Sequence, residues 1–409
     1  MNILLINHYA GSNIHGMEYR PYYLAKEWVK QGHQVTIIGA SHSHIRTVQP
    51  TLKEKWTEEM LDGIRYIWIK TPKYEGNGVK RVINMVSFVK ELQFNSNKIV
   101  KNISPDIVIA SSTYPLDIYP AASIAKKAKA KLIFEVHDLW PLSPMLLGNM
   151  SRYHPFIMLM QKGENDSYRK ADTVISFLPK ALDHMVEHGM KPEKFNYLPN
   201  GIDVSQWERS KEKIPEAHQS VIDKLKSENK FLIGYAGTHG IANALEYVIE
   251  ACELLRDEPI TFVFVGKGPE KDKLIEQAKE KNITNLEFLP VINKEAIPDF
   301  LSKMDCLYIG WRRSPLYQYG VSPNKLLDYM MSAKPILHGI EAGNDLVAEA
   351  NCGISFPPQD PQELALAIKK MRNTTKEERE QFGINGRDFV KANHDYEVLA
   401  KKFLNIMSE

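Results

Sequence analysis

A short apolar run closed by glycines, Phe231-Leu232-Ile233-Gly234-Tyr235-Ala236-Gly237, opens the second half of the chain. The run is apolar on both faces of a strand, and a segment with helical periodicity follows it. The same succession of buried strand and helix recurs toward both ends of the sequence. Such a succession is typical of a parallel sheet that helices cover on both faces, so we expect an α/β protein.

The predicted strands form two groups, separated by a polar stretch from about Ser205 to Asn229. The first group comprises Ile3–Asn7, Gln34–Gly39, Ile64–Ile69, Asp106–Ser111, Lys131–Val136 and Thr173–Phe177, and the second comprises Phe231–Tyr235, Ile260–Val265, Asn285–Leu289, Asp305–Ile309, Pro335–His338 and Gly353–Phe356. A chain of 409 residues is also too long for one ordinary core. We expect two doubly wound, Rossmann-like domains at 1–203 and 204–385, with a helical segment at 386–409 that packs back on the first domain.

The composition is that of a soluble globular protein, with 43% hydrophobic and 25% charged residues. A net charge of +2 gives no argument for a nucleic-acid partner. The cysteines, Cys252, Cys306 and Cys352, lack the close spacing of a zinc site or a disulfide framework. Neither a signal peptide nor an apolar stretch of about 18 residues is present. We expect a cytoplasmic protein that is at most peripheral to a membrane.

Two glycine turns follow strands of the second half, where ligands of such sheets bind. Gly234-Tyr235-Ala236-Gly237-Thr238-His239-Gly240 precedes a predicted helix, and Val265-Gly266-Lys267-Gly268-Pro269 closes the next strand. Glycines allow a helix N-terminus to approach an anion closely. The alternative is that they only make tight turns between strand and helix, since such motifs are weak alone.

A third segment, Gly320-Val321-Ser322-Pro323-Asn324-Lys325-Leu326-Leu327-Asp328, specifies a helix start. We expect Ser322 as N-cap and Pro323 as the first helical residue. The amides there, with Lys325, would bind a diphosphate, and Asp328 would accept hydrogen bonds from ribose hydroxyls. The alternative makes Lys325 a solvated charge and Asp328 an acid that complements the helix dipole.

In the first half, His137 and Asp138 follow a buried strand and would face the ligand crevice. A satisfied structural histidine is the alternative. The loop from Asn7 to Glu18 precedes a helix predicted from about Arg20 to Gln31. Arg20 is the residue of this segment that we expect to contact an anion. The alternative is that its aliphatic stem covers the helix while its charged head stays in water.

Together these motifs resemble family 4 of the retaining glycosyltransferases, which have the two-domain GT-B fold. The resemblance spans nearly the whole chain. It rests on Gly32-His33-Gln34-Val35, His137-Asp138-Leu139-Trp140-Pro141, Leu198-Pro199-Asn200-Gly201-Ile202-Asp203, Tyr235-Ala236-Gly237, Val265-Gly266-Lys267-Gly268-Pro269 and Ser322 to Met330. The sequence looks similar to the branch that builds bacterial surface polysaccharides, such as lipopolysaccharide and capsule, including transferases that act on N-acetylfucosamine.

The resemblance implies a nucleoside-diphosphate sugar donor, UDP being the expected nucleotide, and retention of configuration without metal or cofactor. A glycan or polyprenyl-linked acceptor would bind the first domain. His137, Asp138 and Lys325 would be catalytic, with Lys325 and nearby amides stabilising the leaving group. The expected donor contacts are Gly16, Gly237, Thr238, His239, Gly266, Lys267, Arg312, Ser322, Pro323, Asn324, Lys325, Leu326 and Asp328, and the expected acceptor contacts are Arg20, His15 and Trp140.

The chain departs from the family pattern at two places. Gly320 stands where the first acid of the family's paired-acid motif is expected, so recognition of the sugar must differ there. Thr238 and His239 replace the usual Arg and Lys after the first strand of the second domain, and Arg312 or Arg313 would supply the charge instead. Two rival functions follow: a nucleotide-sugar epimerase on the same fold, and a catalytically silent nucleotide-sugar binding subunit.

Two segments of the first half could contact a membrane. The segment from Tyr74 to Leu92 combines apolar residues with Lys80, Arg81 and Lys90, as a basic amphipathic helix at an anionic membrane would. The stretch Pro155 to Met160 is also apolar. The alternative for both is an amphipathic helix that faces its own core.

Overall fold

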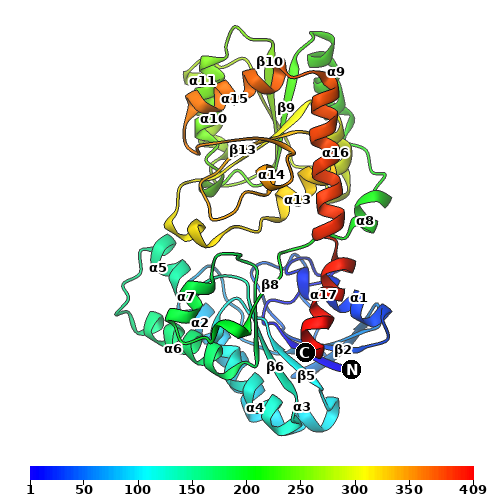
Figure 1. Ribbon diagram of the computed structural model, residues 1–409, viewed down its shortest axis with the longest axis vertical. Coiled ribbons are helices and arrows are strands. Elements are labelled where there is room, and N and C mark those ends of the chain that lie inside the picture. The colour runs from blue at the N-terminus through cyan, green and yellow to red at the C-terminus, as the bar shows by residue number, and fades with distance from the viewer. The chain divides into compact units, whose positions relative to one another are not determined.

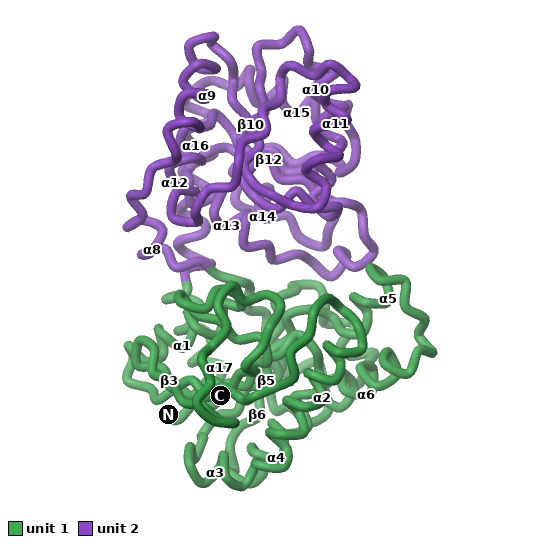
Figure 2. The backbone as a smooth tube through the Cα atoms, turned by 180° about the vertical axis from the view of Figure 1, so that it is seen from behind, with its two compact units in different colours: residues 1–201, 396–409 green, residues 202–395 purple.

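The computed structural model describes residues 1–409 and divides them into two compact units. Unit 1 comprises residues 1–201 and 396–409, and unit 2 comprises residues 202–395 (Figures 1 and 2). The first boundary lies close to the expected residue 203. The segment that returns to unit 1 is shorter than expected, because helix α16 (Lys376–Asn393) packs on α13 (Asn324–Met331) within unit 2 and only α17 (Tyr396–Ser408) goes back.

Unit 1 is built on an eight-stranded sheet in the order β3-β4-β2-β1-β5-β6-β7-β8, parallel except for the β3–β4 pair. Its order changes direction between β1 and β5, and ligands of doubly wound sheets bind at such a point. Its elements are β1 (Asn2–Ile6), α1 (Arg20–Lys30), β2 (Gln34–Ala40), β3 (Trp56–Leu61), β4 (Ile64–Ile69), α2 (Val79–Phe94), α3 (Ser96–Ile103), β5 (Ile107–Ala110), η1 (Pro115–Asp117), α4 (Ile118–Ala128), β6 (Lys131–Val136), α5 (Leu142–Gly148), α6 (Pro155–Lys170), β7 (Thr173–Ser176), α7 (Leu182–Glu187), η2 (Pro192–Lys194), β8 (Phe195–Tyr197) and α17.

Unit 2 is built on a six-stranded parallel sheet in the order β11-β10-β9-β12-β13-β14, which changes direction between β9 and β12. Its elements are α8 (Val204–Arg209), α9 (Glu216–Ser227), β9 (Phe231–Ala236), η3 (Ile241–Asn243), α10 (Glu246–Leu254), β10 (Ile260–Val265), α11 (Lys271–Glu280), β11 (Leu286–Leu289), η4 (Lys294–Ala296), α12 (Ile297–Ser302), β12 (Cys306–Gly310), η5 (Pro315–Tyr319), α13, β13 (Ile336–Gly339), α14 (Leu346–Glu349), β14 (Gly353–Phe356), α15 (Pro361–Asn373) and α16.

Helix α17 completes the core of unit 1 although it comes from the end of the chain. The Trp28 ring of α1 meets Phe403 edge on, with ring centroids 5.1 Å apart, and the Trp28 indole N–H donates to the Ala400 carbonyl at 3.2 Å. Tyr23 stacks on Tyr396. Burial of such aromatic side chains contributes about 1.5–3 kcal/mol each, so α17 is an integral part of unit 1.

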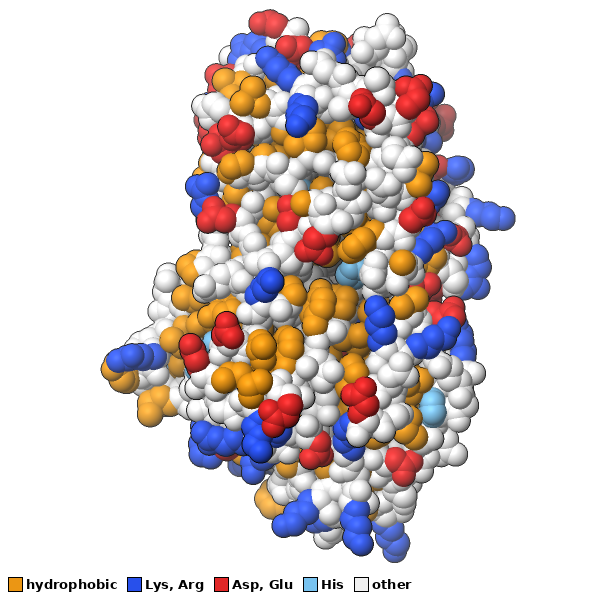
Figure 3. Space-filling model, viewed as in Figure 1, with side chains coloured by type: hydrophobic (Ala, Val, Ile, Leu, Met, Phe, Trp, Pro, Cys, Tyr) orange, Lys and Arg blue, Asp and Glu red, His pale blue; other side chains and the backbone are white.

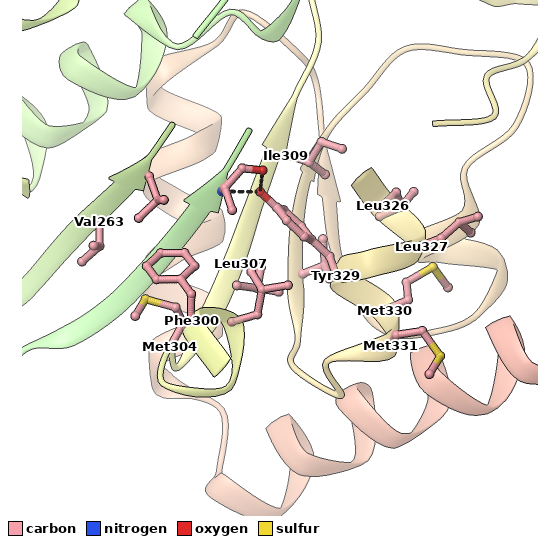
Figure 4. Close-up of a cluster of buried hydrophobic side chains, with 14 of the residues drawn as sticks. Val263, Phe300, Met304, Leu307, Ile309, Leu326, Leu327, Tyr329, Met330 and Met331 are labelled. Carbon is pink, nitrogen blue, oxygen red and sulfur yellow. Dashed lines mark hydrogen bonds between the residues drawn. The ribbon is translucent and has the colours of Figure 1, made fainter. Parts of the chain in front are cut away.

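A buried cluster fixes α13 against the sheet of unit 2 (Figure 4). Leu326, Tyr329 and Met330 of α13 are almost fully buried beside strand residues such as Leu307. The Tyr329 hydroxyl lies between the backbone N–H and C=O of Ala236, at 2.8 and 3.2 Å. The start of α13 is thereby held near the end of β9, at the point where the sheet changes direction.

No helix of the structure is both long and apolar enough to cross a membrane. The predicted strands are confirmed, with ends that differ by at most one residue, and the helix predicted from Arg20 is α1. Two strands were not predicted. Strand β3 is a partly exposed edge strand that contains Glu58 and Glu59, and β8 has only three residues.

Candidate active site

The centre of the candidate site in unit 2 is the Lys325 side chain, one residue into α13. Its ammonium donates to the Tyr235 hydroxyl and to Asn243 Oδ1, both at 2.8 Å, and lies 4.4 Å from the centre of the Tyr235 ring. Both hydrogen-bonding partners are neutral oxygens. Burial lowers the pKa of Lys325 to about 7, since no carboxylate compensates for its loss of water. An incoming anion would supply the missing charge.

Helix α13 begins one residue later than expected. Pro323 has an extended conformation and is the N-cap, and Asn324 is the first helical residue. The N-cap and first-helical roles expected of Ser322 and Pro323 are therefore wrong, because a proline with ψ of 130° cannot belong to the helix. The first-turn amides, including those of Lys325 and Leu326, still lack intrahelical partners as at any helix start.

Asp328 lies one turn further along α13 and is half-buried. Burial raises the pKa of its carboxyl to about 6, and the charge of Lys294 offsets part of that rise. Asp328 and Lys325 thus lie on one helix, with perturbed pKa values in opposite directions. Such clustering of perturbed groups is typical of functional sites.

The two glycine turns of unit 2 pack on each other. Gly237 N donates to the Val265 carbonyl and His239 N to the Lys267 carbonyl, both at 3.0 Å. A Cβ on Gly266 would lie 2.0 Å from the Gly237 oxygen, and one on Gly268 would lie 2.3 Å from the His239 oxygen. These glycines are required by the close approach of two loops, so the amides of Gly237 and His239 are not available to a phosphate in this conformation.

Gly237 has a second role beside Lys325. A Cβ there would lie 2.6 Å from Lys325 Cε, so the absence of a side chain makes room for the lysine. The predicted helix does not begin at this turn, because η3 intervenes and α10 starts only at Glu246. The glycines of this turn therefore do not lead directly into a helix N-terminus that could approach an anion.

The side chain of His239 does not face a ligand. The ring is fully buried and contacts the rings of Tyr235, Phe264 and Phe288. Burial, aided by Lys271 and Lys325, lowers its pKa to about 4, so the ring is neutral. His239 therefore cannot replace the cation that the family has in this region, whereas Thr238 and Lys267 remain exposed.

Arg312 and Arg313 do not supply that cation either. Arg312 pairs with Glu246 and donates to the Ile241 carbonyl, which ties the loop after β12 to η3 and α10. Arg313 pairs with Glu341 at 2.9 Å. Their expected role as donor cations is not supported, since each guanidinium already has a carboxylate. Lys325 differs from both arginines, because its ammonium bonds to neutral oxygens.

Gly320 has a positive φ of 106°, a conformation that residues with a side chain rarely adopt. Its N–H donates to the Tyr317 carbonyl at 2.9 Å and ends η5. The next residue, Val321, is tied to the Asn344 side chain through both its N–H and its C=O. The loop is therefore built around a glycine at the position where a glutamate was expected.

In unit 1, His137 belongs to a buried polar chain. Its Nε2 lies 3.3 Å from Glu135 Oε2 and 2.9 Å from the Ser111 hydroxyl, which itself donates to Glu135 at 2.6 Å. Arg20 Nε pairs with the other oxygen of Glu135 at 3.0 Å. Burial alone would raise the pKa of Glu135, but Arg20 and His137 outweigh it and lower the value to about 2. A permanently charged Glu135 therefore orients His137.

Two of the expected acceptor contacts are buried inside unit 1. The Arg20 guanidinium is fully buried, donates also to the Pro199 carbonyl, and lies 4.1 Å from the Phe177 ring centre. His15 is 3% exposed, bonds to the Ser12 hydroxyl and meets Trp68 edge on. Direct contact with an acceptor is wrong for both residues in this conformation, because protein atoms already surround them.

Gly16 does not offer its amide to a phosphate. Its N–H donates to the Ser12 carbonyl and its C=O accepts from the Ser12 N–H, at 2.9 and 3.0 Å. Its φ of 92° explains why glycine occupies this position. The loop is also closed by Gly11, where a Cβ would lie 1.9 Å from the Gly16 oxygen.

Trp140 and Asp138 lie where an acceptor could reach them. They line a recess beyond the carboxyl ends of β5 and β6, which we call the β6 recess; its lining residues are Ser112, Thr113, Pro115, Phe134, Val136, His137, Asp138, Trp140, Glu164 and Tyr168. Trp140 is half-buried and Asp138 is exposed. Its lining combines an aromatic ring with carboxylates and hydroxyls, and the space between these side chains is small. Glu135, Ser111, Tyr235 and Asn243 are site residues that the sequence analysis missed.

Family models match both halves of the chain. Residues 14–206 match the model described as Glycosyltransferase Family 4, and residues 218–389 match the model described as Glycosyl transferases group 1. Together the two matches cover most of unit 1 and most of unit 2.

Curated relatives resemble the chain over most of its length. The putative colanic acid biosynthesis glycosyl transferase WcaI of Escherichia coli (strain K12) is 23% identical over 390 residues, which cover 93% of each chain. The probable glycosyltransferase WbjE of Pseudomonas aeruginosa is 24% identical over 278 residues, which cover 64% of this chain and 66% of WbjE.

Solved structures share the fold at low sequence identity. Anabaena HepE in complex with UDP and glucose superposes with a TM-score of 0.65 at 16% identity, covering 100% of both chains. The sucrose-phosphate synthase of Thermosynechococcus elongatus gives 0.71 at 15% identity, covering 99% of this chain and 98% of its own. OtsA, a trehalose-6-phosphate synthase, gives 0.73 at 12% identity, covering 100% and 99%.

Proposed function

Since the chain is a glycosyltransferase with the GT-B fold, similar over its length to WcaI of polysaccharide biosynthesis, we propose that it transfers a sugar with retention from a UDP-sugar to a glycan or lipid-linked acceptor. The observation that carries the proposal is Lys325, a half-buried ammonium whose two hydrogen-bond partners are neutral. A diphosphate is the anion that such a site would take at a helix start.

The donor diphosphate would lie at the start of α13, against the Lys325 ammonium and the first-turn amides. These groups would stabilise charge on the leaving nucleotide as the bond to the sugar breaks. Asp328 would accept from the ribose hydroxyls. No metal ion or cofactor enters this scheme, because the ammonium and the amides supply the positive charge.

His137 and the β6 recess would serve the sugar and the acceptor. Glu135 and Ser111 both face Nε2 of His137, which keeps the ring in one orientation. Trp140 would provide a stacking face for the acceptor glycan, and Asp138 would hydrogen-bond its hydroxyls. The donor sugar itself is proposed to be an N-acetylated aminosugar of the N-acetylfucosamine type, on the resemblance of the sequence alone.

The missing carboxylate at Gly320 distinguishes this site from the family pattern. Because the backbone there has a positive φ and is tied on both sides, the loop favours glycine over glutamate. We expect donors to be recognised without a carboxylate at this position. Backbone groups of the loop would then meet the sugar hydroxyls.

A lipid-linked acceptor would bring unit 1 to an anionic membrane, and unit 1 has a surface suited to it. Helices α2 and α6 share a buried cluster through Met85 and Met160, so core packing is confirmed for both. Both helices nevertheless expose apolar side chains. Figure 3 shows apolar side chains on the surface of unit 1 near α5 and its following loop. The exposed apolar residues are Val79, Ile83, Leu146, Leu147, Tyr153, Met158 and Leu159, and Lys80 and Arg152 lie among them in sequence.

This surface is tested by flotation with vesicles of phosphatidylcholine alone and with phosphatidylglycerol added. We expect flotation only with the anionic vesicles, and less of it for Ile83→Glu. Leu254→Glu, an equally exposed leucine of unit 2, is the matched control. Absence of binding to anionic vesicles would exclude the membrane contact.

The proposed reaction is tested with a panel of nucleotide sugars. The true donor should stabilise the protein against heat, by about 2.7 kcal/mol at 100 times its dissociation constant. Transfer to an acceptor should follow and should be lost in Lys325→Ala and His137→Ala with folding intact. An epimer formed from the donor without acceptor would support the epimerase instead, and binding without any turnover would support the silent subunit.

A further inference from the structure

Three metal-ligating side chains lie together in unit 1, outside the residues proposed for catalysis. Glu164 of α6, His184 of α7 and His188, the C-cap of α7, each bring one ligand atom within 4.8 Å of the others. We propose that these three residues bind a divalent transition-metal ion, with Zn²⁺ the best match. The ion would join α6 to α7.

The donor set selects the class of ion. Two imidazole nitrogens and one carboxylate oxygen suit Zn²⁺ and its neighbours in the first transition row, whereas Mg²⁺ and Ca²⁺ prefer oxygen ligands throughout. Three protein ligands leave a fourth tetrahedral position for water. The cysteines take no part, because all three lie buried in unit 2.

The hydrogen bond of His188 shows which of its ring nitrogens is occupied. Its Nδ1 lies 2.8 Å from the His184 carbonyl, and a carbonyl can only accept, so Nδ1 carries the proton. In the neutral ring, Nε2 is then the nitrogen whose lone pair could coordinate an ion. A backbone carbonyl on the other ring nitrogen is the usual support for a metal-bound histidine.

The carboxylate of Glu164 is held in place in the same manner. It is 2% exposed and accepts from Gln161 Nε2 at 2.7 Å and from the Tyr168 hydroxyl at 3.0 Å. His184 Nε2 lies 3.1 Å from Oε1, the same oxygen that accepts from Tyr168, whereas Gln161 bonds Oε2. These supports restrict the carboxylate to one orientation, as second-layer partners of metal ligands do.

The two imidazole rings lie side by side, with centroids 4.3 Å apart. Because Glu164 also lines the β6 recess, the ion would stiffen the wall of that recess.

The test uses the untagged full chain, treated with a chelator and then titrated with Zn²⁺. We expect one ion per chain and a rise in melting temperature on addition of Zn²⁺. Co²⁺ in its place should give the visible absorption of a tetrahedral site. In His188→Ala the apparent dissociation constant should increase at least about tenfold, since even second-layer changes lower metal affinity 10- to 100-fold.

Two further variants keep the outcome unambiguous. His33→Ala, another half-buried histidine of unit 1, should bind Zn²⁺ like the unchanged protein. Glu164→Gln retains the shape of the side chain and should lose most of the Zn²⁺-induced rise in melting temperature. Absence of stoichiometric Zn²⁺, or equal Zn²⁺ affinity in His188→Ala and the unchanged protein, would overturn the proposal, and the cluster would then be a hydrogen-bonded support of α7 only.

Discussion

The affinity of the protein for UDP should fall as the pH rises above 7, because Lys325 loses its proton. Burial holds the pKa of its ammonium at about 7 in the free protein. A bound diphosphate favours the charged form and raises that pKa. Binding therefore takes up a proton when the pH exceeds 7.

The magnitude follows from the two protonation states. At pH 8 about one tenth of the free protein has a charged Lys325, and at pH 9 about one hundredth. The dissociation constant should thus increase roughly tenfold per pH unit, equivalent to about 1.4 kcal/mol, until the pH reaches the pKa of the bound state. The terminal phosphate of UDP, with a pKa of about 6, is already ionised over this range.

The assay is isothermal titration of UDP from pH 7 to pH 9 in two buffers that differ in ionisation enthalpy. The difference between the two heats counts the protons taken up. Lys325→Met should weaken binding about 10- to 150-fold at pH 7, which corresponds to the 1.5–3 kcal/mol of a charged hydrogen bond, and should abolish the pH dependence.

Lys334→Met is the matched control for this experiment. Lys334 is also a half-buried lysine of unit 2 with a pKa lowered by burial, but it follows the far end of α13. Its variant should keep both the affinity and the pH profile. A dissociation constant that is flat between pH 7 and 9, or a slope that persists in Lys325→Met, would refute the reasoning.

Two further predictions concern the scaffold of the site. Glu135→Gln should lower the unfolding free energy of unit 1 by about 3–5 kcal/mol, because it leaves the buried Arg20 without a counter-charge, whereas Glu58→Gln in an exposed pair with Arg65 should cost no more than about 1 kcal/mol. Calorimetry of the unit 1 transition measures both, and equal effects would contradict the assigned role of the ion pair. Gly320→Glu should not improve donor affinity and should destabilise unit 2 by about 1–3 kcal/mol through its positive φ. Gly320→Ala introduces the same backbone strain without a carboxylate, so it shows which part of the effect comes from strain. Tighter donor binding by Gly320→Glu would contradict the prediction, because it would show that the loop accepts an acid.

The strands could be predicted because each is a local pattern. In β1, β6 and β10, nearly every residue is buried, so an apolar run of about the right length was sufficient evidence. Strand β3 was missed because its Thr-Glu-Glu-Met segment is at an antiparallel edge, where solvent accepts charged side chains. The segment expected to pack back on the first domain, 386–409, includes the end of α16, which instead packs on α13, a helix that is not adjacent to it in sequence.

The sequence predicted the candidate site only where the functional side chains come from one continuous segment. Lys325 and Asp328 share a helix, and the family resemblance marks their segment. The burial of His239 depends on Phe264 and Phe288, which come from two other strands. Arg20 and Glu135 are 115 residues apart, so no local pattern shows that they pair. Contacts of this kind become visible only in the folded chain.

The two units use buried charge in opposite ways, and this contrast identifies the anion site. In unit 1, Arg20 is fully buried but is paired with Glu135, so its charge is satisfied within the protein. In unit 2, Arg312 and Arg313 are paired as well, whereas Lys325 meets only neutral oxygens. A buried ammonium without a counter-ion is costly unless a ligand supplies one. The unpaired charge of Lys325 lowers the stability of unit 2, and a bound anion would restore that stability. We therefore expect a diphosphate to bind tightly at α13 and not at either arginine.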